Sequence, residues 1–425
     1  MPFTIAEKIL ARAAGQAGLT AGDDIQVKPD FVHAYDFPGY TDVIFKTMKE
    51  EFGIDQIPEP ERYAIFIDHM VPAIDPKEEL LHAGTREWCA DNNVALFERK
   101  GIGHQVASEV GYAVPGSFLV HFDGHISQMG AFGMLAVGLR RHLLEAFVRE
   151  TITFQVPATT RVNLTGKLQP GVMARDVFHH VVRTIGPRSC NFQVLEFGGD
   201  GMMNFTIADR QTLCGLAMFT GAITAIVNPD EMTLAYTGPL ACLELDPVCS
   251  DDDAEFAAVH DIDISDLAPT VVVPPNPSNT EDLTDHLGLE VHTGYLGSCA
   301  SGRLEDLRAA AQVLKGRKIK EGFAFHVIPT SNVIMARAAE EGLITILADA
   351  GAFISSSSCD YCFGRIATMS AGQRAVSTGT LNVRGRMGSP DSEIYICNAA
   401  AVAAAALEGK IADPRDYFDG PGDTQ

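Results

Sequence analysis

The stretch Gly294-Tyr-Leu-Gly-Ser-Cys-Ala-Ser-Gly-Arg303 runs an apolar segment into a turn of small residues, and Leu304–Leu314 follows at once. The first part is typical of a buried strand and the second of a helix. The same alternation recurs upstream, where Arg62–Ile67 and Ser117–Phe122 indicate strands and Leu135–Glu150 indicates a helix. Strands that alternate with helices predict stacked α/β layers with mainly parallel sheets.

Further elements are predicted near both ends of the chain. Thr4 and Glu7 have the spacing of a capping box, which starts a helix that Gly15 closes. Leu343–Leu347 is an apolar run that indicates a strand. Ala399–Ala406 predicts a helix packed closely on a sheet, because alanine is the best helix former.

Length and one unusual segment predict more than one domain. The chain has 425 residues, and a domain usually takes roughly 150. Residues 250–277 combine an acidic cluster with several prolines, a composition that interrupts helices and central strands. We therefore expect a domain connection there, with domains at residues 1–265 and 266–425.

The composition excludes several classes of protein. Hydrophobic residues make up 46% of the chain, which is too many for a disordered protein. The formal net charge of −23 repels nucleic acid and anionic lipid. Every apolar stretch is far shorter than the ~20 residues of a membrane span, and Glu7 and Lys8 interrupt any secretory signal. We expect a cytoplasmic protein that binds neither nucleic acid nor membrane.

The nine cysteines do not form the even, dense framework of a small secreted protein. Cys359 and Cys362 form a CxxC, which alone could be a redox pair, half of a zinc site or a chance spacing. Cys299 has a comparable setting at the turn after an apolar run. A redox pair needs two thiols and structural zinc four, whereas three suit an iron–sulfur cubane whose fourth iron is free to act as a Lewis acid.

Several motifs in a fixed order make the chain resemble the aconitase superfamily, most closely the large subunits of 3-isopropylmalate dehydratase and homoaconitase. They include TIAEKILARAAG at 4–15, IDHMVP at 67–72, GIGHQ at 101–105, GAFGMLAVG at 130–138, LEFG at 195–198 and GRMGSPD at 385–391. The resemblance implies aconitase-like three-layer α/β/α domains with mainly parallel sheets, without the swivel domain. A separate small swivel subunit would then supply that domain and the catalytic base, in a heterodimer or heterotetramer.

The same resemblance assigns the site residues. It places the ligands of a [4Fe–4S] cluster at Cys299, Cys359 and Cys362, and catalytic residues at Asp68, His69, His104, Asp123 and His125. Arg386 matches an arginine that binds a substrate carboxylate. Each position also has a structural interpretation, because a histidine after a strand is often only hydrogen-bonded and Arg386 could pair with Asp391.

Several positions depart from the family pattern. Gly124 replaces a serine, Ser301 an asparagine, and Asp360-Tyr361 the usual Gly-Pro between the paired cysteines. Phe219 stands where the family has the carboxylate partner of the histidine at 125, so we expect that imidazole to lack a nearby anion. Leu381 replaces a carboxylate-binding arginine, and an apolar side chain cannot hold a carboxylate.

The implied function is that of the large, iron–sulfur subunit of an aconitase-like hydro-lyase. Its substrate would be a small hydroxy acid less anionic than usual for the family, or one with an apolar or ring group. The positions that bind it would be Arg386, Ser301, Phe219 and Leu381. Two alternatives stay open. A [2Fe–2S] cluster or a single iron, with Asp360 as a possible ligand, could serve a dehydratase of a cyclic or phosphorylated hydroxy acid, or the chain could be a non-catalytic iron–sulfur sensor.

Overall fold

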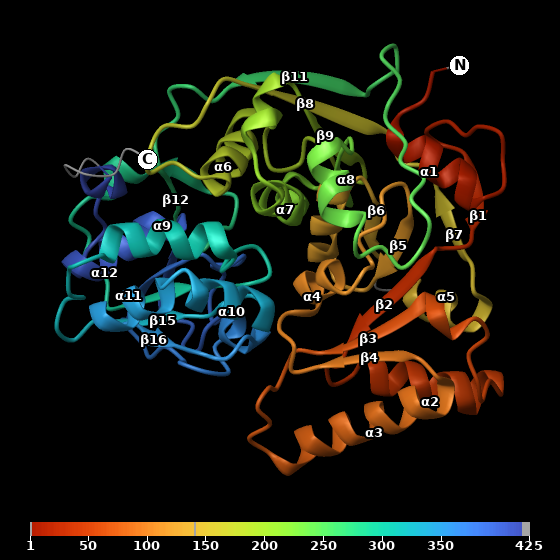
Figure 1. Cartoon of the computed structure of the whole chain (residues 1–425), viewed down its shortest axis with the longest axis horizontal. Coiled ribbons are helices and arrows are strands. Elements are labelled where there is room, and N and C mark those ends of the chain that lie inside the picture. The colour runs from red at the N-terminus through yellow and green to blue at the C-terminus, as the bar shows by residue number, and fades with distance from the viewer. Residues whose placement is uncertain (1, 140–141, 419–425) are drawn as a thin grey trace.

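The structure is a computed structural model that describes residues 2–139 and 142–418. Its first sheet has five strands, all parallel, in the order β4-β3-β2-β5-β6 (Figure 1). The strands are β2 Phe31–Tyr35, β3 Tyr63–Ile67, β4 Ala95–Glu98, β5 Phe118–His121 and β6 Leu135–Gly138. The helices around this sheet are α1 Ile5–Ala13, α2 Thr41–Phe52, α3 Pro76–Asn92, α4 Gly103–Glu109 and α5 Leu143–Arg149, with the 3-10 helices η1 Pro60–Arg62 and η2 Gly124–Phe132.

Two smaller assemblies complete the first part of the chain. A two-stranded antiparallel ribbon pairs β1 Asp24–Val27 with β7 Ile152–Gln155. A four-stranded parallel sheet has the order β10-β9-β8-β11. Its strands are β8 Thr159–Thr165, β9 Val194–Gly198, β10 Thr224–Val227 and β11 Ala258–Asp263, and its helices are α6 Ala174–Ile185, α7 Ile207–Gly215, α8 Glu231–Thr237, η3 Asp200–Asn204 and η4 Ala217–Thr220.

The third sheet has seven strands in the order β13-β12-β18-β17-β14-β15-β16. Only β12 runs against its two neighbours. The strands are β12 Thr270–Val272, β13 Thr280–Asp282, β14 Thr293–Leu296, β15 Ala324–Val327, β16 Phe353–Ile354, β17 Arg374–Ser377 and β18 Glu393–Ile396. The helices are α9 Leu304–Leu314, α10 Asn332–Glu340, α11 Leu343–Ala350, α12 Ala399–Glu408, η5 Leu283–His286, η6 Cys359–Phe363 and η7 Pro414–Tyr417.

Local sequence signals predicted several of these elements correctly. The capping box of Thr4 and Glu7 is present, and α1 ends just before Gly15. Residues 399–406 of the alanine-rich α12 are all buried, which lets this helix pack closely on β14 and β17. The mainly parallel α/β architecture is confirmed, because the strands of the first and second sheets are all parallel.

Two predicted elements are wrong in type. Leu343–Leu347 begins a helix, α11, which lies between left-handed Gly342 and Gly351. A short apolar run fits a buried strand and a buried helix equally, so periodicity could not decide. Leu135–Glu150 is not one helix, because β6 pairs with β5 and α5 starts only at Leu143.

The acidic, proline-rich segment is more ordered than its composition indicates. β11 lies in it as the edge strand of the second sheet, and β12 joins the third sheet. Pro269 and Pro274 flank β12 rather than interrupt it, which is why a strand forms there. The domain division at residue 265 stays a prediction.

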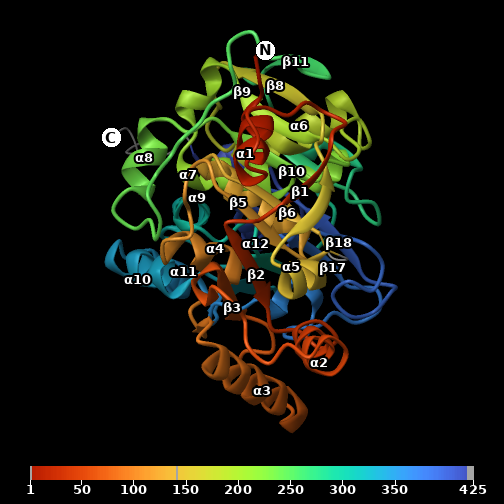
Figure 2. The same ribbon diagram turned by 90° about the vertical axis from the view of Figure 1, so that its right-hand side faces the viewer.

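The apolar core of the first two sheets is continuous. One buried cluster contains residues from Ile5 to Leu267, whereas the third sheet has separate clusters of its own. α2 and α3 lie together at one end of the molecule (Figure 2). Backbone hydrogen bonds join the first and third sheets, from Cys359 N to Asp68 O at 3.0 Å and from Ile102 N to Thr330 O at 2.8 Å.

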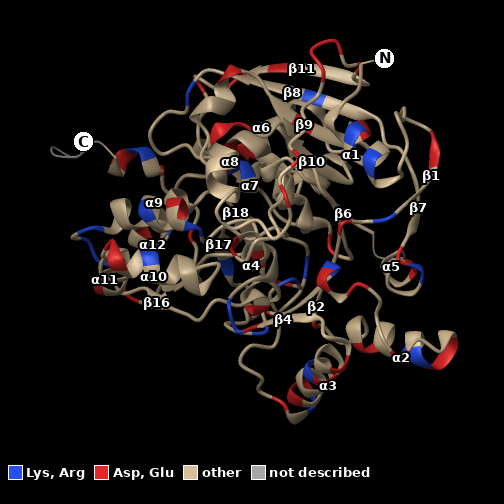
Figure 3. Ribbon diagram, turned by 45° about the vertical axis from the view of Figure 1, so that its right-hand side comes forward, with Lys and Arg blue, Asp and Glu red and all other residues tan. Residues whose placement is uncertain are grey.

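Acidic side chains lie on several outer elements, among them β1, β11 and α3 (Figure 3). Within the described residues, none of the helices combines the length and the apolar character that a bilayer crossing requires.

Candidate active site

The carboxyl ends of parallel strands from two sheets carry the predicted site residues. Asp68 and His69 follow β3, Asp123 and His125 follow β5, and Cys299 follows β14. Open α/β sheets bind ligands at the carboxyl ends of their strands. This arrangement brings together segments that are up to about 230 residues apart in sequence.

The three predicted cluster cysteines are free thiols that lie near one another. Cys299 is buried, and Cys359 and Cys362 are half-buried. A hydrogen bond from the Cys359 thiol holds the pKa of Cys362 well below its usual range, and the Arg386 guanidinium acts in the same direction against the effect of burial. The pKa of Cys359 is raised, first by that same hydrogen bond, and burial raises the pKa of Cys299. The site therefore favours a thiolate at Cys362.

Arg386 contacts this thiolate directly. Its Nε donates to the Cys362 carbonyl at 2.9 Å, and its Nη2 donates to Cys362 Sγ at 3.1 Å. Thr380 Oγ1 lies 3.8 Å from the same sulfur. The alternative pairing of Arg386 with Asp391 does not occur among the described residues. Arg386 is half-buried, with its Nη1 group left over for another acceptor.

Asp68 orients His69. Asp68 Oδ1 lies 2.6 Å from His69 Nδ1, and Asp68 Oδ2 accepts from Gly103 N at 2.7 Å. Burial alone would lower the pKa of His69, but the charge of Asp68 and this hydrogen bond outweigh burial and raise it. His69 can therefore carry a proton in a buried position.

Asp123 plays the same part for His125. Its Oδ1 lies 3.0 Å from His125 Nδ1 and also accepts from His125 N at 2.7 Å. Burial lowers the pKa of His125, but the charge of Asp123 prevails and raises it. The expectation that His125 lacks a nearby anion is therefore wrong. Asp123, two residues earlier in the chain, supplies that anion.

Tyr35 is a site residue that the sequence analysis missed. It ends β2, its hydroxyl donates to Asp123 Oδ2 at 3.0 Å, and its ring centroid lies 4.4 Å from that of His69. Burial and the charge of Asp123 raise the pKa of its phenol, so the hydroxyl stays a donor. The sequence signal that could have indicated Tyr35 is its position at the end of an apolar run, β2.

His104 differs from the other two histidines. Burial lowers its pKa, and neighbouring carboxylates compensate only in part, so His104 is favoured in its neutral form. The Nε2 atoms of His104 and His125 are buried without a hydrogen-bond partner in the described part of the chain. Buried polar atoms normally have partners, so these nitrogens suit a bound ligand. Groups whose pKa values are pushed apart can divide acid and base roles.

Two buried arginines, also missed from the sequence, hold the cysteine loops. Arg303 is 1% exposed and donates to the Cys299 carbonyl at 2.8 Å. Arg175 is 4% exposed and donates to Ala300 O at 3.2 Å and Thr378 O at 2.6 Å. Burial lowers the pKa of both guanidinium groups, and the charge of Asp306 opposes that effect at each of them. Both place positive charge near Cys299, which suits an anionic centre there.

The remaining predicted positions surround these groups. Phe219 is buried in η4, which packs against η2, the 3-10 helix that contains His125. Leu381 is half-buried against the large core. Ser301 is fully buried, and its backbone pairs with Ser298. A side chain at Gly124 would meet Met218 at ordinary van der Waals distance, so the family serine would have room.

The chemistry of the residues present fits an iron–sulfur cluster. No group of three His, Cys, Asp or Glu side chains in the described ranges could hold one metal ion. Three cysteines on two loops, with arginines hydrogen-bonded to Cys362 Sγ and to the Cys299 carbonyl, form a donor set typical of iron–sulfur ligation. Both oxygens of Asp360, the possible ligand of a single iron, accept hydrogen bonds from backbone amides in this structure.

The fold and the site define an α/β protein with three neighbouring thiols beside an Asp–His network. The sequence model of the Aconitase family (aconitate hydratase) matches residues 68–288 and 280–409, and the chain belongs to this family. The family predicted from the motifs is thus confirmed, and with it the enzyme class, a hydro-lyase.

Full-length relatives agree. The chain is 36% identical over 422 residues to 3-isopropylmalate dehydratase large subunit 1 of Methanopyrus kandleri, an alignment that covers 98% of this chain and 100% of the relative. It is 33% identical over 418 residues to the probable methanogen homoaconitase large subunit of Methanothermobacter thermautotrophicus, covering 97% and 98%. The solved structure of Thermococcus kodakaraensis aconitase X is similar with a TM-score of 0.49 and 11% identity, covering 93% of this chain and 90% of that one.

Proposed function

We propose that this chain is the iron–sulfur subunit of a hydro-lyase that adds or removes water across a carbon–carbon bond of a small hydroxy acid. The observation that carries the proposal is the meeting of three free thiols on two loops with the His125 imidazole and the Arg386 guanidinium. When bound, a [4Fe–4S] cluster held by Cys299, Cys359 and Cys362 would supply Lewis acidity at an iron without a protein thiolate.

The side chains of this chain divide the remaining work. His69 and His125, each paired with an aspartate, hold protons that can be given to a departing hydroxyl group. His104 is neutral and can accept a proton. Arg386 has N–H groups left to hold one substrate carboxylate.

The substrate we propose is less anionic than the usual family substrates, or carries an apolar or ring group. Phe219 and Leu381 place apolar side chains where the family pattern has a carboxylate and an arginine. An arginine replaced by leucine removes the bidentate contact that holds a second carboxylate. One carboxylate, held by Arg386, remains compatible with these residues.

A small swivel subunit completes the proposed enzyme, as a heterodimer or heterotetramer. The relatives are named large subunits, which supports a separate small subunit that brings the catalytic base. We place the assembly in the cytoplasm, because free thiols and an iron–sulfur cluster require a reducing compartment.

The test is anaerobic reconstitution of the full chain with iron and sulfide, followed by quantitation of both elements and electron paramagnetic resonance (EPR). We expect one cubane per chain, and loss of cluster and activity in Cys299→Ser, Cys359→Ser or Cys362→Ser. Cys214→Ser, at a buried thiol in α7, is the matched control and should keep both. A single iron without sulfide, or turnover by the triple serine variant with a small subunit, would overturn the proposal.

A further inference from the structure

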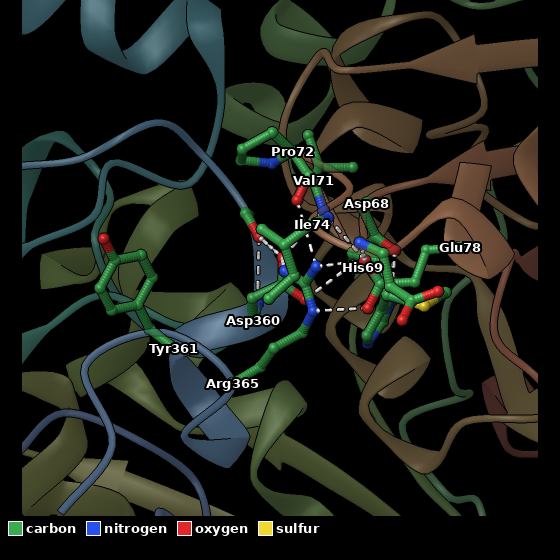
Figure 4. A network of polar contacts seen from close by, with 12 residues as sticks. Asp68, His69, Val71, Pro72, Ile74, Glu78, Asp360, Tyr361 and Arg365 are labelled. Atoms are coloured by element: carbon green, nitrogen blue, oxygen red, sulfur yellow. Dashed lines mark hydrogen bonds and ion pairs between the residues drawn. The ribbon is translucent and has the colours of Figure 1, made fainter.

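The two residues between the paired cysteines point in opposite directions (Figure 4). Tyr361 enters the core of the third sheet, where its hydroxyl donates to Ser355 Oγ at 2.6 Å. Asp360 is fully buried and points to the Met70–Val71 turn, which directly follows His69 in the first sheet. The Asp-Tyr pair thus faces two different parts of the molecule.

The turn at Met70 presents two amides to the Asp360 carboxylate. Met70 N donates to Oδ1 at 2.7 Å, and Val71 N donates to Oδ2 at 2.9 Å. Met70 has a φ of 56°, in the left-handed region that non-glycine residues rarely adopt. Successive amides in such a turn form a concavity that binds an anion. Here the carboxylate of a distant loop fills it and stabilises a strained backbone.

Arg365 closes the contact from the other side. Its Nη1 donates to Asp360 Oδ2 at 3.1 Å, and its other nitrogens hold both oxygens of Glu78, at 3.1 and 2.6 Å (Figure 4). Its Nη2 also donates to Pro72 O at 3.2 Å. Arg365 is 10% exposed in its side chain and Glu78 19%. Because the ion pairs are largely shielded from solvent, salt should screen them little.

A backbone contact lies next to this network. Cys359 N donates to Asp68 O at 3.0 Å, and the Asp68 carboxylate orients His69. The segment 68–72 is therefore held at three places: Cys359 bonds to its start, Asp360 to its middle and Arg365 to its end.

We propose that Asp360 is a positioning residue that locks the Cys359–Cys362 loop to the Asp68–His69 turn. The sulfur atoms and the His69 imidazole then keep one fixed geometry, although they belong to different sheets. The usual Gly-Pro of the family pattern has no side chain that could make this contact. The consequence for catalysis rests on the proposed function, whereas the lock itself does not.

The test uses Asp360→Asn, which keeps the shape of the side chain but turns one acceptor into a donor facing a backbone amide. The first readout is the rate at which iodoacetamide modifies Cys359 and Cys362 in the cluster-free full chain, followed by mass spectrometry. We expect at least a tenfold faster reaction, because the loop opens more often. Glu196→Gln is the matched control. Glu196 is also fully buried and paired with an arginine, but lies in β9 and should leave the rate unchanged.

The second readout is the reconstituted enzyme with its small subunit. We expect Asp360→Asn to keep the cluster and the KM but to change the EPR spectrum of the reduced cluster and lower kcat at least tenfold. A merely structural role would lower stability in both variants and leave the spectrum and kcat alone. Should Asp360→Asn fail to fold, Arg365→Gln must show the same faster labelling. The conservative Arg365→Lys must then bring the labelling rate most of the way back to that of the wild type.

The outcomes separate the two proposals. Unchanged labelling in Asp360→Asn and Arg365→Gln overturns the lock, whether or not a cluster forms. If the wild-type chain binds no cluster but the labelling rates rise as expected, the lock stands and the proposed function fails.

Discussion

Tyr35→Phe tests whether the carboxylate of Asp123 must be held from both sides. The change removes one hydroxyl and keeps the ring, whose centroid lies 4.4 Å from that of His69 and 4.3 Å from that of Phe122. Asp123 Oδ2 loses its donor, while Oδ1 keeps His125. A hydrogen bond to a charged group contributes about 1.5–3 kcal/mol. If the transition state needs this orientation, kcat falls by about tenfold to 150-fold.

The assay is steady-state kinetics of the reconstituted enzyme, with cluster content measured in the same samples. We expect kcat to fall and KM to change little, because the hydroxyl binds Asp123 and not the substrate. Tyr63→Phe is the matched control, since this fully buried tyrosine donates to the Ala146 carbonyl, away from Asp123. A kcat within twofold of wild type, or an equal loss in Tyr63→Phe, would refute the reasoning.

Three further predictions concern stability and specificity. Burial lowers the pKa of His33 to about 3 from its ordinary 6.5. Between these two pH values the unfolded chain binds this proton and the folded chain does not, so the free energy of unfolding decreases as the pH is lowered. At pH 5 this histidine lowers the free energy of unfolding by about 2 kcal/mol relative to pH 8. Urea midpoints measured at both pH values should therefore differ less in His33→Leu than in the wild type. An equal difference would contradict the assignment to His33. Arg175→Met should reduce the free energy of unfolding by about 3 kcal/mol or more, because three carbonyls lose a charged donor. The same variant should bind less cluster. A full cluster content would show that other contacts hold these loops. Phe219→Glu together with Leu381→Arg should shift kcat/KM toward more anionic hydroxy acids, and an unchanged preference would mean that these side chains do not face the substrate.

The histidines illustrate how far motif matching reaches. The sequence placed His69 and His125 after strands and assigned them to one site. The sequence could not predict the protonation states of these histidines, because their pKa values depend on partners such as Asp123 and on burial. The loss of the family carboxylate at Phe219 therefore predicted an imidazole without an anion, whereas a carboxylate two residues away does the pairing.

Local signals determined the parts of this protein that depend on neighbours in sequence. A capping box starts α1, an alanine run makes α12, and an apolar run before a small-residue turn places Cys299 at the end of β14. These features follow from backbone propensity and hydrogen bonds within a few residues, so the chain alone fixes them. The same reasoning failed at Leu343, because an apolar run of that length suits either a strand or a helix.

Tertiary structure decided what those elements do together. It turned Asp360 away from the cysteines and onto the Met70 amide, placed Tyr35 on Asp123, and buried Arg175 beside Ala300. Each contact joins residues from about 90 to about 290 positions apart. Such pairs form only when elements far apart in sequence pack side by side, so packing, and no local propensity, selects them.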